Sequence, residues 1–248
     1  MRAERVIWQR EVKAALLHGA TYIEWAAFTA ACGWSFTAAL RSGDGGFVRV
    51  AELWGQSVGW WLPFLSALLT MRLFSGERAS GTLETLLTAP VSEWQVVWGK
   101  YWAAFSIGLF GLALTVVLPL LMLPYLAPAL TVATSGAGVA LAAAALAIQL
   151  ALWIAVGLFF SLLWVHSVAA LVSSLFVCVL LPYVATLTAT TWFSVEWLAR
   201  LGVPGGGWAA EVAGGLIVVS PWVCYGAGAW CFVFMTVQLL EVRQIRSY

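Results

Sequence analysis

The sequence has few charged residues. Asp, Glu, Lys and Arg make up 9% of its 248 residues, whereas soluble domains carry about a quarter. Because 62% of the residues are apolar, a water-soluble globule of this size could not cover its surface with ionised groups, so most of that surface must face lipid. The formal net charge of +1 excludes the strongly basic surface typical of nucleic-acid binders. The composition therefore predicts an integral membrane protein without a nucleic-acid partner.

Motifs for phosphate binding and metal binding are also missing. The chain has one Gly-Lys pair, Gly99 and Lys100, but Trp94 stands where a phosphate-binding loop requires its first glycine. The metalloprotease pattern HExxH does not occur, and the two histidines, His18 and His166, lie far apart in the sequence. We therefore expect that this chain binds no ATP, metal or other cofactor, and that it is not an enzyme.

The four cysteines do not form a CxxC pair, which argues against a disulfide framework or a zinc site. All of them fall within apolar stretches, where cysteine behaves as a small apolar side chain. We interpret all four as packing residues: Cys32, Cys178, Cys224 and Cys231.

Long stretches without any charged residue are the main positive feature. They run from Trp25 to Leu40, Leu53 to Met71, Tyr101 to Val195 and Val212 to Leu240. A helix needs about 20 mostly apolar residues to cross a bilayer, so the third stretch holds several spans. The fold class predicted is all-α: a single polytopic domain over residues 1–248, with six spans at about 20–40, 57–73, 102–123, 137–163, 168–187 and 216–240. The turn near His166 lacks basic residues, which leaves five or seven spans open.

Basic residues indicate the orientation of these spans, since Lys and Arg near span ends stay in the cytoplasm. With six spans and a cytoplasmic N-terminus, nine of the twelve basic residues are cytoplasmic, and Arg41, Arg49 and Arg200 are outside. The expected location is the cell (inner) membrane, with both termini cytoplasmic.

The N-terminal segment, residues 2–17, has the pattern of a helix that lies on the membrane surface. Trp8 and Val12 share an apolar arc, and Arg10 and Lys13 lie roughly opposite. Glu11 interrupts the arc.

Glu24 lies inside the first expected span, where an ionisable residue points to function by default. It is either a proton or cation site, or a carboxylate that is hydrated at the interface or paired with Lys13 or Arg10. Its position near the start of the span favours the second interpretation.

The connection between the second and third expected spans, residues 74–93, is the most informative segment. Ser92 and Gln95 form a capping-box pattern, which predicts that a helix begins at Glu93. Thr82 to Leu87 reads as a short helix with leucines on one side and Glu84 on the other, either a docking element or a plain loop.

This segment resembles the corresponding loop of ABC transporter type-2 permeases, particularly their gliding-motility-type branch. Gly157 and Ser161 in the fourth span are weaker similarities. The resemblance rests on Met71, Arg72, Phe74, Glu77, Gly81, Thr82, Leu83, Glu84, Leu86, Leu87, Pro90, Ser92, Gly99 and Lys100, in order.

The resemblance implies the membrane subunit of an ATP-driven transporter. It would pair with a second permease copy, identical or paralogous, and be driven by separate ABC ATPase subunits that hold the ATP and magnesium. The residues implied in ATPase coupling are Glu77, Arg78, Gly81, Thr82, Leu83, Glu84, Leu86 and Leu87, together with the surface helix.

Spans with so few charges favour export of an apolar or amphipathic molecule. An alternative is a mechanical transmitter that passes ATPase motion to a periplasmic partner without moving a substrate. Its contact surface would lie between Thr188 and Gly214, with Trp192, Trp197 and Trp208, although such tryptophans also serve as interfacial anchors.

Overall fold

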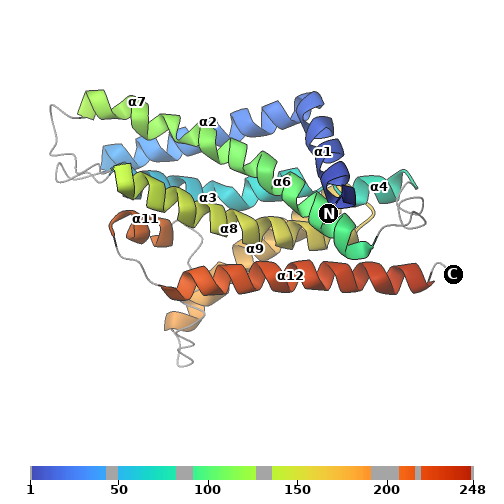
Figure 1. The fold of residues 1–248 in the computed structure, drawn as a ribbon. Helices are drawn as coiled ribbons and strands as arrows, with labels where there is room; N and C mark the ends of the chain where they lie inside the picture. Colours follow the sequence, from blue (N-terminus) through green and yellow to red (C-terminus); the bar gives the residue numbers. More distant parts are fainter. Residues whose placement is uncertain are drawn as a thin grey trace.

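The computed structural model describes residues 2–42, 50–81, 92–126, 136–190, 207–215 and 219–246. Within these ranges the chain is all-helical (Figure 1). The helices are α1 (Arg2–Leu17), α2 (Gly19–Ser42), α3 (Val50–Thr70), α4 (Ser75–Ala79), α6 (Glu93–Thr115), α7 (Val117–Leu126), α8 (Gly136–Leu163), α9 (Ser167–Thr190), α11 (Gly207–Ala213) and α12 (Val219–Arg246).

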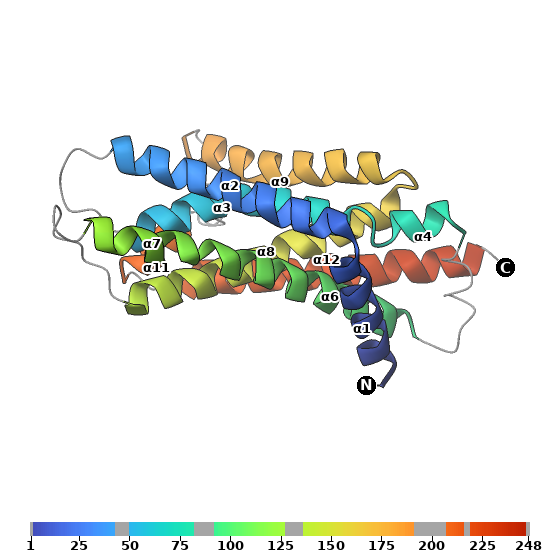
Figure 2. The same cartoon turned by 90° about the horizontal axis from the view of Figure 1, so that it is seen from above.

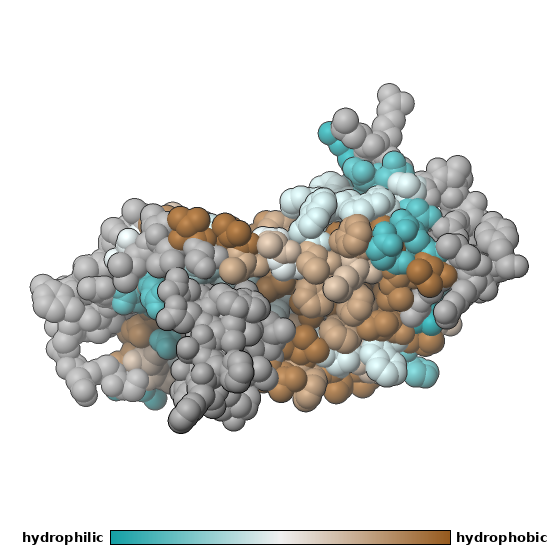
Figure 3. Space-filling model, turned by 90° about the horizontal axis from the view of Figure 1, so that it is seen from below, coloured by the Kyte–Doolittle hydropathy of each residue, from teal (hydrophilic) through white to brown (hydrophobic). Residues whose placement is uncertain are grey.

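The long helices run side by side along the length of the molecule, and α1 crosses them at one end (Figures 1 and 2). Helix α4 and both ends of the chain lie at that same end, which we call the α4 end. Helices α7 and α11 lie at the opposite end. Apolar residues cover much of the described surface next to the α4 end in Figure 3, and hydrophilic residues gather at that end itself.

Helix α8 is the centre of the bundle and packs against α3, α6, α9, α11 and α12. Small residues let the helices approach closely, as is usual between membrane helices. A Cβ atom on Gly157 of α8 would lie 2.0 Å from the Thr70 hydroxyl oxygen of α3. Ala142 and Ala145 are fully buried in the same helix.

Four segments are long and apolar enough to cross a membrane: Val50–Ala79, Glu93–Leu121, Gly138–Leu163 and Pro221–Val242. The described part of α9 contributes a shorter apolar segment, Ser167–Leu180. Helix α2 is not among the four, because Glu24 and the Thr, Ser, Gly and Trp residues between its apolar residues lower its mean hydropathy. The chain is therefore a multi-pass membrane protein with four candidate spans among its described residues.

The start of α6 matches the capping-box pattern. The Ser92 hydroxyl accepts from the Gln95 amide at 3.4 Å, and the Gln95 side chain accepts from the Ser92 amide at 3.4 Å. The helix breaks at Val116, ahead of Pro119, which cannot donate a backbone hydrogen bond to Thr115. Trp54 of α3 donates to the Thr115 carbonyl instead, at 3.1 Å.

Two expectations fail at the opposite end of the bundle and on α12. Trp208 is neither a surface anchor nor an exposed contact residue: it is buried in α11 and stacks on Tyr225. The cause is the close packing of α11 on α3, where Gly55 approaches the backbone of Ala209. Cys231 is exposed, so it does not pack inside the described bundle. Trp192 and Trp197 lie outside the described residues.

Candidate functional site

Helix α1 packs against α6 at the α4 end of the bundle. The inward face of α1 repeats every three or four residues and is half-buried, as expected for a helix with one packed side. Gly99 permits the contact, because a Cβ atom there would lie 2.8 Å from Cγ2 of Ile7. Trp8 adds a hydrogen bond from its indole Nε1 to the Ser106 hydroxyl, at 3.0 Å. The inward positions are Glu4, Ile7, Trp8, Glu11, Val12 and Ala15.

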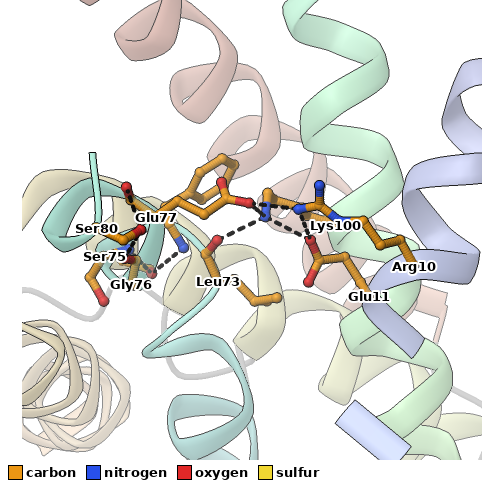
Figure 4. A network of polar contacts seen from close by, with 10 residues as sticks. Arg10, Glu11, Leu73, Ser75, Gly76, Glu77, Ser80 and Lys100 are labelled. Atoms are coloured by element: carbon orange, nitrogen blue, oxygen red, sulfur yellow. Dashed lines mark hydrogen bonds and ion pairs between the residues drawn. The ribbon is translucent and has the colours of Figure 1, made fainter. Parts of the chain in front are cut away.

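Lys100 follows Gly99 and points into this junction, where its side chain is 1% exposed. Its ammonium group donates to Glu77 at 2.8 Å, to the Leu73 carbonyl at 2.9 Å and to Glu11 at 3.1 Å (Figure 4). These three bonds use all three donors of a lysine. The Phe74 ring lies beside the ammonium, with its centroid 5.2 Å from Nζ. A buried charge needs such compensation, because an unpaired one costs several kcal/mol.

Arg10 of α1 completes a group that we call the charge cluster: Arg10, Glu11, Glu77 and Lys100. Its Nη2 atom lies 3.1 Å from Glu77 Oε1 and 3.3 Å from Glu11 Oε1. Two cations and two carboxylates balance in formal charge. The cluster joins α1, α4 and α6. The hydrogen bond from the Lys100 ammonium to the Leu73 carbonyl also connects it to the turn after α3.

Helix α4 is held on its other side by α8 and α9. Phe74, at the N-cap position, forms no capping bond with its own side chain. Instead, the Ser161 hydroxyl of α8 accepts from the backbone amides of Phe74 at 3.1 Å and Ser75 at 3.2 Å. The Ser75 and Ser167 hydroxyls are hydrogen-bonded at 3.0 Å. The first turn of α4 is thus capped by another helix.

Arg78 adds a second link between α4 and α8. Its Nη1 atom donates to the carbonyls of Leu162 at 2.9 Å and Leu163 at 3.0 Å, at the C-terminal end of α8. Carbonyls in the last turn of a helix have no intrahelical partner, and a cation there also complements the helix dipole. Glu77 and Arg78, adjacent in sequence, therefore tie α4 to α6 and to α8.

Gly81 follows α4 with a φ of +72°, a left-handed conformation that glycine adopts without a steric cost. It directs the chain into residues 82–91, which lie outside the described residues. The predicted coupling positions in that segment are Thr82, Leu83, Glu84, Leu86 and Leu87.

The structure brings together several residues that the sequence singled out separately: Arg10 of the surface helix, Glu77 and Arg78 of the connection, and Gly99 and Lys100 of α6. Lys13 is exposed and takes no part. Sequence reasoning missed Glu11 and undervalued Ser161. A carboxylate on an otherwise apolar arc was the available signal, because a helix can bury it only against a counter-charge.

Sequence reasoning overlooked one catalytic pattern, that of the serine hydrolases. Residues Gly55 to Gly59 match GxSxG, with Ser57 in the nucleophile position. That motif requires a sharp strand-to-helix turn that exposes the serine. Here it lies in the interior of α3, and Ser57 is buried and donates to the Leu53 carbonyl at 2.7 Å. The match is therefore part of a helix rather than a nucleophile elbow.

A family model described as ABC-2 family transporter protein matches residues 18–198. The matched region runs from the start of α2 through α9 and includes α4, Arg78 and Lys100. No curated protein matches the chain.

Proposed function

The chain belongs to the ABC-2 family of transporter membrane proteins, and on that premise we propose that it is the permease subunit of an ATP-driven exporter in the gliding-motility-type branch. Permeases of this family work with ABC ATPase subunits and lack an ATPase domain of their own. ATP and magnesium belong to that partner, and a second permease copy, identical or paralogous, completes the membrane part.

The proposed topology has six spans in one domain: α2, α3, α6 with α7, α8, α9 and α12. Both termini are cytoplasmic. This assignment is supported by the position of both chain ends at the α4 end of the bundle (Figure 2), and by the excess of basic residues at that end. The α4 end is then the end that faces the ATPase.

The coupling mechanism rests on one observation: α4 is fastened both to α6 and to α8. Lys100 binds Glu77 on one side of α4, and Ser161 and Arg78 connect the other side to α8. We assign residues 82–87 to the ATPase contact, with the leucines packing and Glu84 fixing orientation by charge. Movement of the ATPase would then pull on α4 and reach two spans together.

The test is to purify the permease with its ATPase after Glu84→Lys, with Glu211→Lys as the control. Glu211 is exposed on α11, at the opposite end of the bundle. We expect Glu84→Lys to weaken association about tenfold, the effect of reversing one interface charge, and to lower ATPase activity in the complex. Normal association and normal hydrolysis in Glu84→Lys would contradict the assignment.

An apolar or amphipathic cargo is supported by a hollow of about 710 Å³ between α2, α3 and α9. Aromatic and small apolar side chains make up most of its lining, and Ser35, Gln56 and Ser57 supply the polar groups. Tight binding of a small multivalent ion, in preference to an amphipathic dye, would argue against this cargo. The aromatic residues of the lining are Trp34, Trp60, Trp61 and Phe64.

A further inference from the structure

A second cavity, of about 350 Å³, lies against the charge cluster where α1, α2, α3, α4 and α6 meet. Arg10, Glu11, Glu77 and Lys100 line one part of it, and their formal charges already balance within the cluster. The remaining polar lining comes from the α1–α2 corner, from α2 and from the turn after α3. The residues of that second part include His18, Thr21, Glu24 and Arg72.

Glu24 and Arg72 line this cavity without touching each other. Neither side chain makes an ion pair or hydrogen bond with any part of the chain that the structure describes. Glu24 is half-buried and lines the same cavity as Arg72 and His18. The expected pairing of Glu24 with Lys13 or Arg10 is therefore wrong, because Arg10 is engaged in the cluster and Lys13 is exposed on the other side of α1.

The cavity also has an apolar part. Leu68 and Leu69 of α3 and Ile107 of α6 line it, and Leu17 and Ile23 are 88% and 71% exposed on either side of the α1–α2 corner. Polar and apolar walls therefore meet where a membrane-surface helix turns into a membrane-crossing one. This is the depth at which a phospholipid changes from headgroup to acyl chain.

We propose that this cavity binds the headgroup of a zwitterionic phospholipid with a primary amine, phosphatidylethanolamine, in the leaflet at the α4 end. The phosphate binds the Arg72 guanidinium, whose planar donor set matches phosphate oxygens. The ammonium donates to the Glu24 carboxylate, and the acyl chains extend along Leu17 and Ile23. Two unpaired charges of opposite sign on one cavity match a ligand that carries both signs.

Other phosphate ligands fit less well. An anionic lipid or free phosphate would satisfy Arg72 and leave a carboxylate facing a like charge, which is unfavourable. A choline headgroup carries a quaternary amine without N–H donors, so it would lose the hydrogen bond to Glu24. The proposal therefore predicts a selectivity order as well as binding.

The full-length permease is purified in nanodiscs that contain equal amounts of phosphatidylethanolamine, phosphatidylglycerol and phosphatidylcholine, and the retained lipids are counted by native mass spectrometry. We expect phosphatidylethanolamine to be enriched. Arg72→Gln and Glu24→Gln should each reduce its retention about tenfold, the loss expected for one charge-assisted hydrogen bond. Arg41→Gln, at the far end of α2, should have no effect.

Exchanging the charges of Glu24 and Arg72 distinguishes a loss of lipid binding from a loss of folding. Glu24→Lys and Arg72→Glu should each abolish the enrichment, and the double variant should recover it, because the cavity again holds one charge of each sign. Competition with free phosphoethanolamine and with inorganic phosphate tests the source of the ligand: both should displace the lipid poorly, since neither has acyl chains. Equal retention of the three lipids, preference for phosphatidylglycerol, or ready displacement by phosphate would overturn the proposal.

Discussion

Lys100 carries a charge at a position that is almost closed to solvent. Its three donors reach two carboxylates and one carbonyl, and the carboxylates come from α1 and α4. A buried ion pair of this kind adds little net stability compared with apolar packing, but the loss of one partner is costly because the other charge is left uncompensated. The stability of the protein therefore depends on both α1 and α4 being packed where their carboxylates reach Lys100.

We expect Lys100→Met to destabilise the permease by about 3 kcal/mol or more, since Glu11 and Glu77 would lose the buried cation that both of them bind. Thermal unfolding of the detergent-purified protein measures this change. The control is Lys13→Met, an exposed position on the outer side of α1. Equal unfolding temperatures for the two variants would show that the cluster is not a stabilising contact.

Gly99 sets the distance between α1 and α6. In Gly99→Ala the new methyl group would lie 2.8 Å from Ile7 Cγ2 and 3.3 Å from the Glu4 backbone oxygen, so α1 must move away. We expect a cost of about 1–3 kcal/mol from overpacking, partly offset by about 1 kcal/mol of improved helix propensity.

A cysteine introduced at Val12, on the packed face of α1, reports that movement. It should react faster with a thiol reagent in the Gly99→Ala background than in the unaltered one. Gly226→Ala is the matched control, because no atom of another helix lies within 4 Å of the methyl group that it adds. Unchanged reactivity in both backgrounds would mean that α6 absorbs the methyl group without moving α1.

At the scale of elements, α4 is helical because neighbouring helices stabilise it. Five residues are too few to hold a helix by local hydrogen bonds, since nucleation is unfavourable and isolated helices need about 12 residues or more. Ser161 supplies the missing cap, and Glu77 and Arg78 anchor the turn on both sides. The element is thus ordered by the helices that it connects.

Ser161→Ala should cost about 1 kcal/mol, the usual value of an N-cap, and should loosen the start of α4. Hydrogen exchange of the Phe74 and Ser75 amides should accelerate. The difference in ATPase activity with and without the permease should become smaller. Ser173→Ala is the comparison, because that hydroxyl bonds only to carbonyls of its own helix. Exchange at Phe74 that is as slow as in the unaltered protein would rule out the capping role.

At the scale of the whole molecule, the proposed topology places the two ends of the bundle on opposite sides of the membrane. A cysteine at Ala79, exposed at the end of α4, should react with an impermeant thiol reagent only in opened cells. A cysteine at Glu211, exposed on α11, should react in intact cells. Both are built in a background that lacks the exposed Cys231. The reverse pattern would invert the topology and place α4 away from any cytoplasmic ATPase.

The sequence by itself determined the class of the protein and most of its helices. Low charge and long apolar stretches predict a multi-pass helical membrane protein, because lipid cannot satisfy an exposed backbone. The start of α6 was also predictable, since a capping box is made by residues three apart. The ordered pattern between Met71 and Lys100 indicated the family.

The tertiary structure alone decided which of the singled-out residues meet. Glu11 and Lys100 are 89 residues apart, and Arg78 and Leu162 are 84 apart, so no local pattern connects them. The sequence predicted Trp208 as an interfacial anchor, yet the close packing of α11 on Gly55 of α3 buries its side chain. Local hydrogen bonds and hydropathy fix where helices form, whereas the partners of buried charges are fixed by how those helices pack.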